Sequence, residues 1–232
     1  MLLVLACSDD DPVRAPQNVP PDDTSFSYPL AIGNTWEYAH THTVRFLKPD
    51  GSEHLPPQFR EATSTRELTG IETRGESEYV VEREVFTVVG SEGPVTSWRR
   101  YRQDEMGLHR ADVSLGNPPA DDDETADESV RLSYPLEVGK EWVPIAGDEA
   151  ATATVEARES IVLPAGTLTA YRVAIRTSSM DPNDYKRYWY GRDGLLRVER
   201  HTEFGAVDVS TGIPMTVTID EIQSLTSVSL DR

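Results

Sequence analysis

The segment SYPLAIGNTW at residues 27–36 recurs as SYPLEVGKEW at residues 133–142, and this repeat decides the fold. The two copies align without a gap and share the pattern Ser-Tyr-Pro-Leu-x-aliphatic-Gly-x-x-Trp. Proline lacks an amide donor and suits an extended segment or a sheet edge. Glycine permits a tight turn with positive φ, and tryptophan buries a large apolar area. Each copy therefore predicts a segment that seals one end of a sheet and leads into a strand.

A weaker echo supports the same duplication. Two further segments share one pattern, which predicts an aromatic strand, a turn with acidic residues, Gly-Leu, and an Arg-bearing strand. These segments are residues 98–110 and residues 188–197. We therefore expect two related β halves at residues 26–120 and 130–232, joined by an acidic linker at residues 121–129.

Alternating patterns of apolar residues extend through both halves. One run predicts a strand whose single face carries Trp36, Tyr38, His40, His42, Val44 and Phe46. Residues 168–177 alternate in the same way, and turn signals such as Pro-Asp-Gly at 49–51 separate the runs. No segment keeps a 3.6-residue period over a helix length. The sequence predicts an all-β protein with little helix, built as one or more curved antiparallel sheets or an open half-barrel.

Composition excludes several classes of function. Lys+Arg 22 against Asp+Glu 40 gives a net charge of -18, which argues against nucleic acid and against loose binding to anionic headgroups. The single cysteine, Cys7, excludes an intramolecular disulfide and a multi-cysteine zinc site. No stretch approaches the ~20 apolar residues of a spanning helix. We expect no cofactor.

The N-terminal residues predict attachment to a membrane. Val-Leu-Ala-Cys at residues 4–7 resembles the bacterial lipobox, in which the cysteine thiol receives lipid. Several acyl chains on one residue would anchor the protein stably. We interpret residues 1–6 as a truncated lipoprotein signal peptide and residues 7–25, rich in Asp and Pro, as a lipidated, disordered tether. Ser8 after the cysteine is similar to outer-membrane sorting, so we expect an envelope protein anchored through lipidated Cys7, with palmitate as an expected acyl group.

The motifs together resemble a group of uncharacterised bacterial lipoproteins. The resemblance rests on the two Tyr-Pro-Leu-x-x-Gly-x-x-Trp segments, on Pro-Ala-Gly-Thr-x-x-Ala-Tyr at residues 164–171, and on Tyr-Trp-Tyr at residues 188–190 followed by Gly-Leu. It implies a curved antiparallel sheet, comparable to the open half-barrels of periplasmic lipid carriers. It implies no activity.

Candidate chemistry is sparse. His40 and His42 share a strand face and could hold one metal ion, with His54 or an acidic residue as a third ligand. The favoured alternative is two partly exposed histidines without a metal. The acidic residues 121–128 could bind calcium, but they lack the spacing and glycine of a calcium loop and are better explained as a solvated linker. No Gly-x-Ser-x-Gly motif is present, and no catalytic residue is assigned.

Aromatic residues supply the remaining candidates for ligand binding. They could line a groove for an acyl chain or a glycan, or they could be core packing, which we favour; the residues are Trp98, Tyr101, Tyr185, Tyr188, Trp189 and Tyr190. The expected function is a non-enzymatic envelope lipoprotein that binds a protein, lipid or glycan on a sheet face, or that has a structural role. The alternatives are a hydrolase or metal-dependent enzyme near His40 and His42, and a periplasmic lipid or acyl-chain carrier.

Overall fold

The computed structural model describes residues 26–116, 128–144 and 151–231. These residues form strands and turns. The strands are β1 (Thr35–Leu47), β2 (Glu53–Arg74), β3 (Ser77–Val88), β4 (Val95–Gln103), β5 (Gly107–Leu115), β6 (Glu128–Ser133), β7 (Glu141–Trp142), β8 (Ala151–Leu163), β9 (Gly166–Thr177), β10 (Tyr185–Gly191), β11 (Gly194–Val207) and β12 (Pro214–Ser229). Within this described part of the chain, no helix has the length and apolarity needed to cross a membrane.

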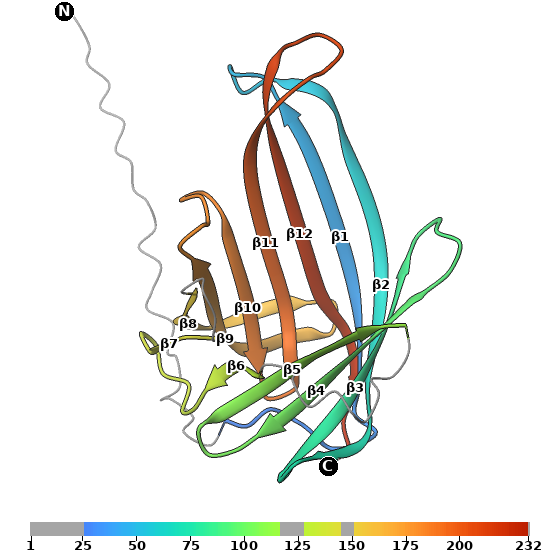
Figure 1. Cartoon of the computed structure of the whole chain (residues 1–232), viewed down its shortest axis with the longest axis vertical. Coiled ribbons are helices and arrows are strands. Elements are labelled where there is room, and N and C mark those ends of the chain that lie inside the picture. Colours follow the sequence, from blue (N-terminus) through green and yellow to red (C-terminus); the bar gives the residue numbers. More distant parts are fainter. Residues whose placement is uncertain (1–25, 117–127, 145–150, 232) are drawn as a thin grey trace, which may run out of the picture.

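All the strands belong to one antiparallel sheet in the order β6-β5-β4-β3-β2-β1-β12-β11-β10-β9-β8-β7. The chain runs up and down through neighbouring strands, and the sheet curls so far that its two edges, β6 and β7, lie near each other in the fold (Figure 1). The upper parts of strands β2, β1, β12 and β11 stand well above the rest of the sheet, and we call these upper parts the blade (Figure 1). The expected all-β fold with a curved antiparallel sheet is confirmed.

The two sequence repeats make the same backbone hydrogen bonds. The Gly33 amide donates to the Leu68 carbonyl, and the Leu68 amide donates back to the carbonyl of the residue after Gly33. The Gly139 amide and Val155 repeat this exchange with the same order of donors and acceptors. The φ angles of Gly33 and Gly139 are 91° and 89°, as the turn predicted from the sequence requires. Both copies thus have a structural role, since their backbone hydrogen bonds hold a turn against a neighbouring strand segment.

The tryptophans that end the two copies differ in burial. Trp36 lies in β1, has no exposed surface, and donates from its indole Nε1 to the Asp193 carbonyl. Trp142 lies in β7, is half-buried, and donates to the Val130 carbonyl of β6. β1 pairs with β12 from Thr35↔Ser229 to Leu47↔Thr216, whereas β6 and β7 are short and are not neighbours in the sheet. The sheet is therefore continuous across the β1–β12 junction and open at the seam between β6 and β7, which the Trp142 hydrogen bond bridges.

The core fills the lower part of the curled sheet. Tyrosines and aliphatic side chains from both halves pack there, and the two equivalent tyrosines of the repeats meet, since the Tyr28 amide donates to the Tyr134 hydroxyl at 3.1 Å. Gly194 has φ +101°, and a Cβ there would lie 2.9 Å from Trp36 Nε1. A Cβ at Gly107 would lie 2.0 Å from the Leu132 carbonyl oxygen, so both Gly-Leu hairpins admit only glycine.

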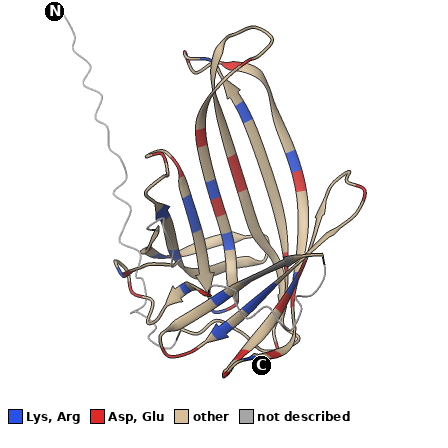
Figure 2. Ribbon diagram, in the orientation of Figure 1, with Lys and Arg blue, Asp and Glu red and all other residues tan. Residues whose placement is uncertain are grey.

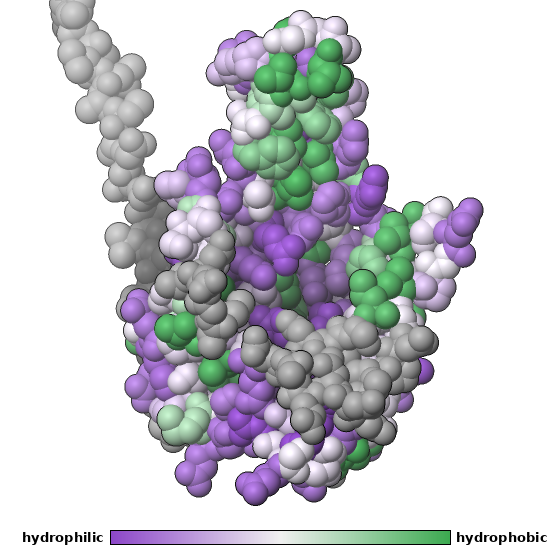
Figure 3. All heavy atoms as spheres, in the orientation of Figure 1, coloured by the Kyte–Doolittle hydropathy of each residue, from purple (hydrophilic) through white to green (hydrophobic). Residues whose placement is uncertain are grey.

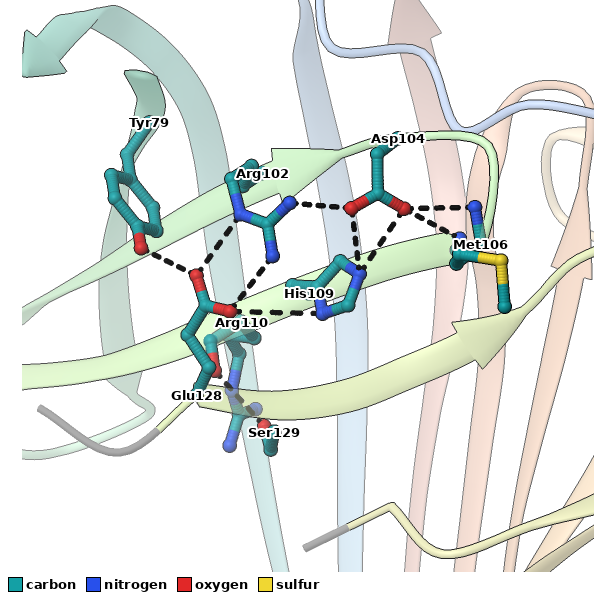
Figure 4. A network of polar contacts seen from close by, with 9 residues as sticks. Tyr79, Arg102, Asp104, Met106, His109, Arg110, Glu128 and Ser129 are labelled. Carbon is teal, nitrogen blue, oxygen red and sulfur yellow. Dashed lines mark hydrogen bonds and ion pairs between the residues drawn. The ribbon is translucent and has the colours of Figure 1, made fainter. Parts of the chain in front are cut away.

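A polar network holds the edge strand β6 on the face of β4 and β5 away from the core (Figure 4). Arg102 donates to Glu128 at 2.9 Å and also pairs with Asp104, while His109 lies 3.3 Å from Asp104. The Tyr79 hydroxyl of β3 donates to Glu128 as well. Glu128 and Ser129, which we assigned to the acidic linker, thus begin a strand, while residues 117–127 lie outside the described residues.

Candidate ligand-binding cavity

A cavity of about 380 Å³ opens on the concave side of the sheet, below the blade. Its cationic lining residues are Arg66, Arg99, Arg110, Arg131, Lys186 and Arg200. Its aromatic lining residues are Tyr28, His40, Phe86, Tyr101, Tyr188 and Tyr190. Glu84 is the one carboxylate among the described lining residues. Figure 2 shows basic positions on β4, β10 and β11, which surround the hollow, and Figure 3 shows hydrophilic side chains gathered in it.

The floor of this cavity is a buried ion-pair network. Arg66 Nε lies 2.9 Å from Glu84, and Arg99 bridges Glu84 and the fully buried Glu82. Burial opposes ionisation of Glu84, but the charges of Arg66 and Arg99 outweigh it and lower the pKa of this carboxyl to about 2. Glu84 is therefore ionised, and both arginines of the floor have a glutamate as partner.

The wall of the cavity carries positive charge that is not balanced in this way. Arg131 and Lys186 lie over the Tyr188 ring at 5.7 and 5.6 Å from its centroid. Among the side chains that the structure describes, neither cation forms an ion pair with a carboxylate, and Lys186 makes a side-chain hydrogen bond with Tyr188. Burial would raise the pKa of Tyr188, but the positive charges of Arg131 and Lys186 outweigh burial and lower it. The wall is thus a positive environment beside an aromatic face.

The predicted aromatic residues divide into two groups. Tyr101, Tyr188 and Tyr190 line the cavity and also belong to the core. Trp98 and Trp189 do not line it, because their side chains point to the opposite face of the sheet; Trp98 donates to the Gly116 carbonyl at 3.4 Å and Trp189 donates to Glu159 at 2.8 Å. Tyr185 stacks on His201, also away from the cavity lining.

The predicted histidines do not converge. His40 Nε2 lies 2.8 Å from the Ser64 hydroxyl, His42 lies 3.9 Å from Glu221, and His54 pairs with Asp208 at 2.8 Å. Over residues 26–116, 128–144 and 151–231, no three His, Cys, Asp or Glu side chains form a group that could hold a metal ion. Ser64 is buried, with 2% of its surface exposed, so the serine–histidine pair offers no open nucleophile.

His40 provides a pH-dependent contribution to stability. Burial lowers the pKa of His40 to about 4, and the charge of Arg66 acts in the same direction. Between pH 6.5 and pH 4 the unfolded chain binds a proton at this residue and the folded chain does not. The stability contribution is therefore complete above pH 6.5 and is lost as the pH falls toward 4.

We expect the free energy of unfolding of the wild type to fall by about 2 kcal/mol between pH 7.5 and pH 5 because of His40. Urea denaturation at several pH values measures this, with His40→Gln expected to remove that part of the pH dependence. His42→Gln serves as the matched control, since it removes an imidazole two residues away on the same face and should keep the part of the pH dependence that His40 causes. A His40→Gln profile parallel to that of the wild type would rule His40 out as the titrating group.

The cationic residues were missed from the sequence, although a signal for them exists. Lys186, Tyr188 and Tyr190 alternate along β10, so one strand face carries a cation and two aromatic rings. Arg99 and Tyr101 alternate in the same way along β4. The strong overall negative charge concealed this local positive pattern.

Other predicted features fall on parts of the chain without a structural description. Cys7, the signal-peptide residues 1–6 and the tether 7–25 lie outside the described residues, as does most of the acidic run proposed as a calcium alternative.

Comparison with known proteins yields two solved structures. Neither family models nor curated proteins match the chain. A candidate lipoprotein from Parabacteroides distasonis ATCC 8503 aligns over 87% of this chain and 97% of its own, with 14% identity and a TM-score of 0.41. A candidate exported protein with a YmcC-like fold from Bacteroides fragilis NCTC 9343 aligns over 87% and 98%, with 13% identity and a TM-score of 0.39. The function proposed below rests on the residues of this chain.

Proposed function

We propose that this protein is a non-enzymatic binding module that holds an organic anion in the cavity below the blade. The observation that carries this proposal is the pair of wall cations, Arg131 and Lys186, which lie over the Tyr188 ring in a chain of net charge -18. An acidic protein has no general reason to gather arginines in a concave site. A cluster of cations in a partly desolvated cavity attracts anions and strengthens charge-assisted hydrogen bonds to them.

The arrangement also selects the kind of anion. The cations of the floor are already paired with glutamates, so the wall residues Arg131 and Lys186 are the ones available to a ligand. Both lie over the buried ring of Tyr188, and the apolar side chains of Leu108, Leu195 and Val198 line the same cavity next to the charge. An anion with an apolar or aromatic body uses both features, whereas a neutral glycan uses only the second.

The fluorescent anion 8-anilinonaphthalene-1-sulfonate is a suitable probe, because it joins a sulfonate to aromatic rings. We expect Lys186→Gln and Arg131→Gln each to weaken its binding about tenfold, which corresponds to the loss of one charge-assisted contact. Affinity should also fall as salt is added, because screening weakens the attraction. Fluorescence titration of the folded variants measures both effects.

Arg187→Gln is the matched control for this experiment. Arg187 follows Lys186 in β10 but pairs with Glu156 on the opposite face, at 3.1 Å. Its removal changes the net charge by the same amount and should leave probe affinity nearly unchanged. Equal weakening by Arg187→Gln would mean that the probe senses overall charge, and the cavity would lose its assigned role. The neutral probe N-phenyl-1-naphthylamine should show no dependence on Lys186.

We further propose that lipidated Cys7 places this module at the bacterial cell envelope, at the outer membrane, as in the lipoproteins whose repeats it resembles. The support is the lipobox-like Val-Leu-Ala-Cys at residues 4–7 and the acidic, Pro-rich residues that follow. Metabolic labelling with a fatty-acid analogue tests this: the wild type should take up label and Cys7→Ser should not.

A further inference from the structure

The inner face of the blade changes character along its length. His40 lines the cavity, so His42, Val44 and Phe46, which alternate with it along β1, share its face. Each of these residues is paired with residues of the neighbouring strands, and the paired residues form a row across the blade. The row that contains Phe46 is apolar throughout and consists of Leu55, Phe46, Val217 and Phe204, which we call the tip row.

The rows below the tip lead down to the cavity. In the first row below the tip, Val44 of β1 is paired with Ile219 of β12. The next row down is polar and consists of Arg60, His42, Glu221 and Arg200. In that polar row two arginines accompany one glutamate. A second cavity of about 340 Å³ lies there, and it shares His40, Phe86, Val198, Arg200 and Gln223 with the first. Arg60 and Arg200 line this second cavity together with Glu61 and Glu221, and the cavity connects the wall cations to the base of an apolar surface.

The apolar surface is exposed. Phe204 and Leu55 of the tip row keep 45% and 43% of their surface accessible. Figure 3 shows hydrophobic side chains gathered on the blade directly above the hydrophilic hollow. From His40 to Phe46 is six residues of strand, or about 20 Å. Within the tip row Val217 is buried, so the exposed apolar surface of this row is formed by Phe204 and Leu55 at its two ends. Exposed apolar patches of this kind often mark a binding surface.

We infer that the ligand is an acidic lipid, with its anionic headgroup among the wall cations and an acyl chain along the inner face of the blade. This inference rests on the proposed function, since the headgroup occupies the same cavity. Charge complementarity orients the lipid: Arg131 and Lys186 lie at the lower end of the path, and the tip row forms its upper end. A short anion would leave the blade uncovered, and an uncharged lipid would leave the wall cations without a partner.

A series of fatty acids separates the two parts of the site. Native mass spectrometry or calorimetry below the micellar concentration would compare hexanoate, dodecanoate and hexadecanoate. Affinity should rise with chain length, by up to about fourfold for each methylene that becomes buried. Lys186→Gln should weaken all three acids by a similar factor. Phe204→Ser should weaken hexadecanoate at least tenfold and leave hexanoate unchanged.

Val209→Ser is the control for the blade. Val209 is fully exposed in the loop between β11 and β12, outside the tip row, and its replacement should not alter the dependence on chain length. Methyl hexadecanoate, which has the chain without the charge, should bind much more weakly than hexadecanoate and should not respond to Lys186→Gln.

The outcomes distinguish the two proposals. Fatty acids that bind with no dependence on chain length would overturn the lipid and leave the anion site intact. A wild type that dimerises, with Phe204→Ser monomeric, would also overturn it and assign the blade to a second copy of the chain. If neither fatty acids nor the sulfonate probe respond to Lys186→Gln and Arg131→Gln, both proposals fail together.

Discussion

Replacing Trp36 by alanine should lower the free energy of unfolding by about 3–5 kcal/mol, the range found for large aromatic side chains removed from a core. Trp36 has no exposed surface and lies in the core cluster that joins β1, β2, β10, β11 and β12. Its indole donates to the Asp193 carbonyl at 2.5 Å, and its ring lies against Gly194. The alanine variant would leave a large cavity and an unsatisfied carbonyl in the β10–β11 turn.

The second copy of the repeat supplies the matched control. Trp142 occupies the equivalent position, but it is half-buried and donates across the seam to the Val130 carbonyl. Trp142→Ala should cost about 1–2 kcal/mol, because less apolar surface is lost. Urea denaturation followed by circular dichroism compares the two variants. Equal losses would mean that the seam is as firmly closed as the β1–β12 junction, contrary to the asymmetry described here.

The repeat was the part of the fold most open to prediction. Proline, glycine and tryptophan at fixed spacing specify an extended segment, a turn and a buried ring, and those are local properties of the chain. Gly33 and Gly139 adopt the positive φ that the pattern requires. The strand on Trp36 and Tyr38 followed from alternation in the same way. Pairing between β1 and β12 could not be predicted, because register between distant strands depends on packing that no local pattern records.

The site was less open to prediction, for an electrostatic reason. Net charge sums over the whole surface, whereas a cavity responds to the few charges that line it. Arg131 and Lys186 become neighbours only because β6 and β10 curl to the same side of the sheet. The sequence predicted Tyr188 as an aromatic residue that could line a groove. In the structure two cations, Arg131 and Lys186, lie over its ring. The sequence pattern that could have shown this is the alternation of cations and rings.

Two adjacent ion pairs join β2 and β3, one in the cavity floor and one on the exposed face of the sheet. The exposed pair is a control for the effect of burial on the pair in the floor. Arg66 is paired in register with Glu84, and the next position pairs Glu67 with Arg83. Arg66 and Glu84 face the cavity, with 10% and 8% of their side chains exposed. Arg83 and Glu67 face the opposite side, with 44% and 38% exposed. The two pairs thus have the same chemistry and differ in burial.

Glu84→Gln should therefore lower the free energy of unfolding at pH 7 by about 3–5 kcal/mol, because it leaves the buried Arg66 and the partly buried Arg99 beside a neutral side chain. Glu67→Gln should lower it by less than about 1 kcal/mol, as for other exposed pairs. Urea denaturation at pH 7 measures both variants. Similar losses from the two would contradict the buried network that the structure shows.

The dependence on pH gives an independent measure of the same network. The pKa of Glu84 is about 2 in the folded chain, below the ordinary value for glutamate. The unfolded chain thus binds the proton first as the pH falls, and stability that is complete above the ordinary pKa is lost as the pH falls toward 2. The difference in stability between the wild type and Glu84→Gln should shrink steadily over that range. A difference that stays constant down to pH 2.5 would mean that the ionised carboxylate is not what holds Arg66 and Arg99, and the floor of the cavity would then owe its stability to packing alone.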